Sequence, residues 1–174
     1  MKILILSINH RHQRVPLKDE LATPEVAERT EAFRNLVKEV AVARGVDLVC
    51  EESDPGYLSI AQHEAFLHEP RIRWKNIMMT AQERLEAGIW EALLYRPQEI
   101  NYEQMVTIDL RIPEDDTREE FFRDEISKAA EEIDAKSALV LCGDAHTESL
   151  GAKLGALGHQ VETDHHLTPE KNWK

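Results

Sequence analysis

A strand, a helix and a second strand follow one another near the N-terminus, and this order restricts the fold more than any other feature. Residues 2–8 form a short apolar run that ends in polar residues, which is typical of a strand buried on both faces of a parallel sheet. Thr23 and Pro24 mark the start of a helix, and Gly45 closes it. Residues 46–50 form the second buried strand. This unit predicts two parallel strands joined by a right-handed crossover.

The rest of the chain continues the alternation of helices and strands. After the first unit we expect, in chain order, a helix over 57–69 that Pro70 ends, a helix over 72–95, a strand over 104–112, a helix opened by a capping box at 117–120, a strand over 137–142, a helix from 144 that Gly158 ends, and an edge strand over 159–162. A polar tail covers 163–174. A length of 174 residues fits one domain. We therefore predict a single α/β domain over 1–174, with a mainly parallel central sheet flanked by helices.

Charge and composition exclude several classes of protein. The chain has 21 basic and 33 acidic residues and a net charge of −12, which would repel the phosphates of a nucleic acid. Its longest apolar run covers only residues 3–6, far short of the ~20 residues that a membrane helix needs. Two cysteines cannot build a disulfide framework, and no signal-peptide cleavage site follows the first strand. We expect a cytoplasmic protein without nucleic-acid or membrane partners.

Polar side chains follow three of the predicted strands at the point where each ends. His10 comes after the first strand, Glu51 and Glu52 after the second, and Asp144 and His146 after the strand over 137–142. In open α/β sheets the binding crevice lies outside the carboxyl ends of the strands. The acids and imidazoles are therefore expected to meet at one place, which is the strongest functional signal that the residues give.

The two histidines are candidates for a general base or a metal ligand. His146 lies in the first turn of a helix, where the helix dipole favours a neutral imidazole. From that position we also expect its removal to open no sizeable cavity. The alternative is a solvated histidine satisfied by Asp144 or Thr147. His10 should reach the same crevice, and its alternative is a loop residue in a basic surface patch with residues 11, 12 and 14.

The acidic pair is expected to separate, because successive side chains of a strand point to opposite faces. We expect Glu51 to lie near His10 and the turn that carries His146, where it could orient a water, take a proton or bind a cation. Glu52 would then point to Lys75 or to the backbone of a neighbouring turn. The alternative is that both acids only cap free N–H groups. Cys50 and Cys142 end two of the predicted strands, and their thiols are expected to pack as small apolar side chains.

Short motifs in this order resemble the superfamily of erythromycin-esterase-like, TraB and Tiki hydrolases. That group has two GxxH motifs, an acidic pair and a helix-start signature. The second GxxH motif is complete here from Gly143 to His146, and the acidic pair is Glu51-Glu52. Residues 75–79 (Lys-Asn-Ile-Met-Met) are similar to the helix signature, while residues 7–10 keep the first histidine but lack its glycine. The resemblance extends over residues 5–158.

The resemblance implies hydrolysis of a small-molecule or peptide substrate, of esterase or peptidase type. The catalytic candidates at the His/Glu site are His10, Glu51, Glu52 and His146. The substrate-binding candidates are Arg11, Lys75, Asn76 and Asp144. Members of the group are described both as metal-dependent proteases and as esterases that use histidine to activate water.

The residues themselves leave the role of a metal open. His10, Glu51 and His146 are enough for three ligands of a divalent ion such as Mn, Co or Zn, with one open position. They are equally enough for a metal-free base and acid. A third hypothesis, from a different class, is a non-catalytic module that binds a small ligand in the same crevice. The missing glycine of the first motif favours that alternative.

Overall fold

The computed structural model contains one five-stranded sheet in which all strands are parallel, in the order β3-β2-β4-β1-β5. It describes residues 1–8, 10, 13–16, 23–89 and 114–165. The three strands that are followed by the candidate acids and histidines, β2, β4 and β1, lie side by side at the centre. The α/β class and the mainly parallel sheet are confirmed.

Most of the predicted elements are present with shifted ends. The strands are β1 (Lys2–Ser7), β2 (Leu48–Glu51), β3 (Arg73–Asn76), β4 (Ser137–Cys142) and β5 (Gln160–Asp164). The helices are α1 (Pro24–Val37), α2 (Ile60–Leu67), α3 (Ala81–Glu86), α6 (Glu114–Glu132) and α7 (Asp144–Ala156). A π-helical segment, η3 (Lys38–Ala43), continues α1 up to the turn at Gly45, whose φ of +66° suits a glycine.

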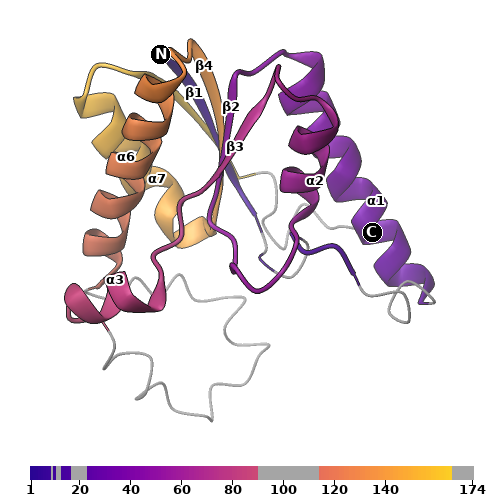
Figure 1. Cartoon of the computed structure of the whole chain (residues 1–174), viewed down its shortest axis with the longest axis horizontal. Coiled ribbons are helices and arrows are strands. Elements are labelled where there is room, and N and C mark those ends of the chain that lie inside the picture. The colour runs from indigo at the N-terminus through magenta and orange to yellow at the C-terminus, as the bar shows by residue number, and fades with distance from the viewer. Residues whose placement is uncertain (9, 11–12, 17–22, 90–113, 166–174) are drawn as a thin grey trace.

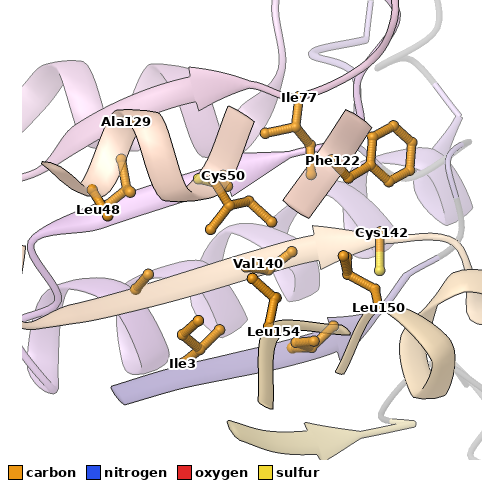
Figure 2. Close-up of a cluster of buried hydrophobic side chains, with 14 residues drawn as sticks. Ile3, Leu48, Cys50, Ile77, Phe122, Ala129, Val140, Cys142, Leu150 and Leu154 are labelled. Atoms are coloured by element: carbon orange, nitrogen blue, oxygen red, sulfur yellow. The ribbon is translucent and has the colours of Figure 1, made fainter. Parts of the chain in front are cut away.

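Helices cover both faces of the sheet. In Figure 1, α6 and α7 lie on one face and α1 and α2 on the other. Side chains of the central strands therefore alternate between two buried clusters. Ile3, Cys50 and Val140 pack toward α6 and α7, as Figure 2 shows, while Val49 and Leu139 belong to the cluster under α1 and α2. This two-sided burial explains why the strands are continuous apolar runs.

The chain leaves the two neighbouring strands β1 and β4 in opposite directions. From β1 it passes to β2 on one side of the sheet, and from β4 it passes to β5 on the other. Such a reversal between adjacent strands is the topological switch point at which α/β sheets bind ligands. His10 follows β1, and the turn from Gly143 to His146 follows β4. The sheet order therefore indicates a ligand site at the same residues as the sequence motifs.

Two of the expected helices differ in the structure. The helix over 72–95 is wrong: residues 73–76 form the edge strand β3, and residues 81–86 form the short helix α3, which opens with a capping box of Thr80 and Glu83. The capping box at 117–120 is also wrong, because α6 already includes Glu114 and places Thr117 within the helix. The expected strand over 104–112 and the end of the polar tail lie outside the described residues.

The helices of the described ranges differ from membrane-spanning segments in length or composition. None of them combines the length and the apolar composition needed to cross a membrane.

Candidate functional site

An open pocket of about 570 Å³ lies at the carboxyl ends of the strands. Its lining comes from the loops after β1, β2 and β3 and from α6: His10, Gln13, Arg14, Glu52, Ser53, Asp54, Tyr57, Met78 and Arg118. The volume is in the range of pockets that hold small-molecule ligands. The pocket therefore lies where the sheet topology predicts a binding crevice.

The buried carboxylate of Glu52 lies at the centre of the polar side chains around this pocket. One of its oxygens pairs with the guanidinium of Arg118, and the other accepts the backbone N–H of Gly143 at 3.1 Å. His10 Nε2 lies 3.5 Å from Oε2, and His146 Nε2 lies 3.8 Å from Oε1. The two candidate histidines thus lie on either side of one carboxylate, which supports the idea of a shared site.

Glu51 points away from this cluster, so the expected orientation of the acidic pair is reversed. Glu51 and Glu52 do face opposite sides, as the pleat requires. Glu52 continues the alternation of Leu48 and Cys50, which face α6 and α7, whereas Glu51 continues that of Val49, which faces α1 and α2. Since α7 carries one of the candidate histidines, only the Glu52 side of the strand can meet it.

Glu51 is instead fully buried in a separate set of hydrogen bonds. Its Oε2 accepts from Ser59 Oγ at 2.5 Å and from Trp74 Nε1 at 2.8 Å, and its Oε1 accepts from Gln13 Nε2 at 3.0 Å. Three donors satisfy a carboxyl group that would otherwise be costly to bury. The side chain thereby joins β2 to α2, β3 and the loop after β1.

His146 is buried and does not line the pocket. Its Nδ1 lies 3.2 Å from Glu119 Oε1, its Nε2 faces Glu52 and Asp115, and its ring packs edge-on against Phe122 with 5.5 Å between ring centroids. Both ring nitrogens of His146 therefore face carboxylate oxygens, which are hydrogen-bond acceptors. From this position His146 can hold the carboxylates of Glu52, Asp115 and Glu119 in place.

His10 is the half-exposed histidine of the site and is seated closely on the turn after β4. A Cβ atom placed on Gly143 would lie 3.0 Å from His10 Nε2 and 3.7 Å from Glu52 Oε2. Gly143 has φ −62° and ψ 152°, which any residue can adopt. The glycine of this GxxH motif therefore allows the close approach of the imidazole, which an added Cβ would push back, and is not needed for backbone freedom.

We expect Gly143→Ala to displace the His10 ring and to lower any activity of the site by about tenfold or more, since small misplacements of reacting groups are costly. The free energy of unfolding should fall by no more than about 1 kcal/mol, the cost of an alanine in place of a glycine N-cap. Gly155→Ala is the matched control, because an added Cβ there meets nothing within 4 Å. Equal activity in the two variants, measured as kcat/KM, would contradict this account of the turn.

The pKa values of the two neighbouring acids move in opposite directions. Burial raises the pKa of Glu52, but the charges of His10, His146 and Arg118 and the Gly143 N–H outweigh it, so the pKa lies below its usual range. Burial also raises the pKa of Glu51, and there the hydrogen bonds from Ser59, Trp74 and Gln13 do not compensate. Ionised Glu52 therefore stabilises the fold, whereas ionisation of Glu51 opposes it.

The lowered pKa of Glu52 predicts that the free energy of unfolding depends on pH. The contribution of Glu52 is fully present above the pKa of the unfolded chain and is lost as the pH falls through the lower pKa of the fold. Urea unfolding followed from neutral to acidic pH should show that Glu52→Gln loses less stability on acidification than the wild-type protein does. A parallel decline of both proteins would show that Glu52 does not contribute to acid sensitivity.

The predicted substrate-binding residues lie apart from the pocket or have structural partners. Lys75 Nζ pairs with Glu125 at 2.5 Å, and the amide of Asn76 exchanges hydrogen bonds with the backbone of Ser53 and Met78. Asp144 accepts from Ser7 Oγ at 2.6 Å and contacts His165 Nδ1 at 2.8 Å. None of the three lines the pocket. Arg11 lies outside the described residues.

The three residues named for a metal do not converge. Glu51 faces α2 and β3, away from the two histidines. Glu52 lies between the histidines, but its positively charged neighbour there is the guanidinium of Arg118. Within the ranges that the structure describes, no group of three or more His, Cys, Asp or Glu side chains is arranged to hold a metal ion. The structure therefore does not bring His10, Glu51 and His146 together as the three ligands of one metal ion.

Several residues of the site were missed from the sequence. Asp115, Arg118 and Glu119 of α6 and Gln13 of the loop after β1 all contact the candidate acids or histidines. A signal for two of them is present: the buried positions of α6 are Asp115, Glu119, Phe122, Ile126, Ala129 and Ala130. The apolar stripe of this helix thus continues into acids at helical spacing, which marks a buried polar end. Nothing local distinguishes Gln13.

Comparisons with models of known protein families, with curated proteins and with solved structures gave no match. The resemblance to the GxxH hydrolases therefore remains a prediction from short motifs, and the function has to be argued from the geometry of the site.

Proposed function

We propose that the protein is a hydrolase in which His10 and Glu52 activate a water molecule. The observation that carries this proposal is the pair formed by His10 Nε2 and Glu52 Oε2, which lie 3.5 Å apart on residues that line the same pocket. Two acceptors at that distance can share one water, which donates a hydrogen to each. The oxygen of that water then directs a lone pair into the pocket, as a nucleophile requires.

In the proposed reaction the water oxygen attacks the carbonyl carbon of an ester or amide. His10 Nε2 takes the proton that the water loses, and the carboxylate of Glu52 stabilises the resulting imidazolium. Arg118 lines the same pocket and offers positive charge to the carbonyl oxygen as it becomes negative. When the bond to the leaving group breaks, His10 returns the proton to it. His146 and Glu119 do not line the pocket and hold the neighbouring acids in position.

The proposed substrate is a small molecule or a peptide with an ester or amide bond. The pocket volume suits part of such a molecule, and its lining offers charged, polar and apolar side chains together. Because the predicted metal ligands do not converge, every step above uses the chain's own residues. Dependence on Mn, Co or Zn remains a separate proposal that the assay decides.

The test is a panel of chromogenic esters and peptides, assayed with the purified protein after chelation and again after addition of Mn, Co or Zn. We expect turnover of at least one substrate by the chelated protein, and loss of that turnover in His10→Asn. His63→Asn is the control, because His63 lies on α2 and does not line the pocket. Turnover that appears only with added metal would refute the metal-free reaction.

The second candidate is a module that binds a small ligand without turning it over. One observation favours it: both oxygens of Glu52 already accept hydrogen bonds from within the protein, from Arg118 and from the Gly143 N–H. A carboxylate held in this way can serve mainly to shape the pocket. Silence of the whole panel under every metal, together with saturable binding of a panel compound, would support this candidate over the hydrolase.

We also propose that the protein works in a reducing compartment, such as the cytoplasm. Cys50 and Cys142, the two cysteines of the chain, are free and buried in the core. Burial raises the pKa of both thiols, so they behave as unreactive apolar side chains.

A further inference from the structure

Gln13 is a buried amide that connects the two halves of the acidic pair to His10. Its nitrogen Nε2 lies 3.0 Å from Glu51 Oε1 and 2.9 Å from the backbone carbonyl oxygen of Glu52. Its oxygen Oε1 lies 2.7 Å from His10 Nδ1. One side chain thus bridges the end of β2 and the imidazole that faces the pocket.

The surroundings of Gln13 permit only one orientation of its amide. A backbone carbonyl can accept but never donate a hydrogen bond, so the Glu52 carbonyl must face the NH₂ group. Turning the amide over would place its oxygen against that carbonyl and against the Glu51 carboxyl group. The amide oxygen is therefore the atom that faces His10, whether or not Glu51 carries a proton.

Glu51 holds this amide in position. Trp74 Nε1, which can only donate, and Ser59 Oγ both bind Glu51 Oε2, and the Ser59 hydroxyl is in turn fixed as the N-cap of α2 by the N–H of Gln62. The carboxyl group is thereby oriented with Oε1 toward Gln13. A buried polar network in which every member is satisfied is rigid, and this one ends at the His10 ring.

We propose that Glu51 and Gln13 are positioning residues that hold the neutral His10 ring in the tautomer protonated at Nδ1. An amide oxygen only accepts, so the hydrogen of the His10–Gln13 bond belongs to Nδ1. Nε2 then carries the lone pair and faces Glu52 and the pocket. Without Gln13, Glu52 Oε2 would favour a hydrogen on Nε2 and remove the proton acceptor. The catalytic meaning of this tautomer rests on the proposed function, but the tautomer itself does not.

The tautomer can be measured on the protein as it is. NMR of the ring nitrogens in ¹⁵N-histidine-labelled protein, at about pH 8 and so above the usual titration range of histidine, distinguishes a protonated Nδ1 from a protonated Nε2. The chain has 8 histidines, and the spectrum of His10→Asn identifies the signals of His10 by their loss. We expect a hydrogen on Nδ1. A hydrogen on Nε2 in the wild-type protein would overturn the proposal without any need for a further variant.

Gln13→Leu tests the cause, because leucine keeps a similar size and removes both ends of the bridge. The proton of His10 should move to Nε2 in this variant, and kcat should fall with little change in KM. Gln62→Leu is the control, since only the backbone of Gln62 takes part in the network. If His10 keeps its Nδ1 proton in Gln13→Leu, the proposal that Gln13 fixes the tautomer is overturned. An inactive wild-type protein with a protonated Nδ1 would overturn the proposed hydrolase function and support the proposed role of Gln13.

Discussion

Replacing Glu52 with glutamine is expected to abolish the activity of the site and to lower the free energy of unfolding by about 3–5 kcal/mol, as for other broken buried ion pairs. The isosteric amide keeps the shape but loses the charge beside Arg118, His10 and His146. It also brings an NH₂ group that must face either the guanidinium of Arg118 or the N–H of Gly143, both of which are donors. Denaturant unfolding followed by circular dichroism measures the loss.

Glu31→Gln is the matched control for this variant. Glu31 pairs with Arg34 at 2.9 Å, but its side chain is 55% exposed, and exposed pairs contribute little. We expect a change within about 0.5 kcal/mol there. Equal stabilities of the two variants would show that the Glu52 ion pair is not the centre of the buried cluster.

Removal of the His146 side chain is expected to have the second-largest effect on stability. His146→Ala should lower the free energy of unfolding by about 2–4 kcal/mol, because it opens a cavity beside Phe122 and leaves the carboxylates of Glu52, Asp115 and Glu119 without the ring. For a chain of this size that corresponds to a fall in Tm of roughly 4–16 °C. Thermal unfolding measures it directly.

His63→Ala provides the comparison for His146. Its side chain is 43% exposed on α2 and lies beside a buried acid, with 3.6 Å between Nδ1 and Glu64 Oε1. Its Tm should stay near that of the wild-type protein. A wild-type Tm for His146→Ala would instead bear out the expectation from the sequence, that a histidine in a first helical turn can be removed at little cost.

The centre of the sheet could be predicted well because the strands β1, β2 and β4 are buried on both faces. Continuous apolar runs such as Lys2–Ser7 and Ser137–Cys142 have few other ways to be buried in a chain of this length. The edge strand β3 was missed because it has only four residues and a mixed character. Ile72 and Trp74 nevertheless alternate with basic residues at a period of two, a pattern typical of an edge strand that was outweighed by the apolar residues after it.

The location of the site was predictable, whereas the arrangement of its residues was not. Polar residues after β1, β2 and β4 had to meet once those strands were parallel and adjacent. Which acid faces the histidines depends on which helix covers which face of the sheet, and the alternation of Leu48 and Cys50 with Val49 decides it only when that is known. Gln13 enters through contacts between residues far apart in the chain, for which the local sequence has no signal. The acids of α6 are marked in the sequence only by their helical spacing from the apolar stripe, which does not show what they contact.

The most direct test of the central claim is the kcat/KM of chelated protein on the best substrate of the panel, compared between the wild type and His10→Gln. Loss of a general base typically costs 10²–10⁴ in rate, so we expect a fall of at least about 100-fold. The variant should unfold at nearly the wild-type Tm, because His10 is half exposed. Equal kcat/KM values in the two proteins would contradict the account, because a base that can be removed without loss of rate does not activate the water.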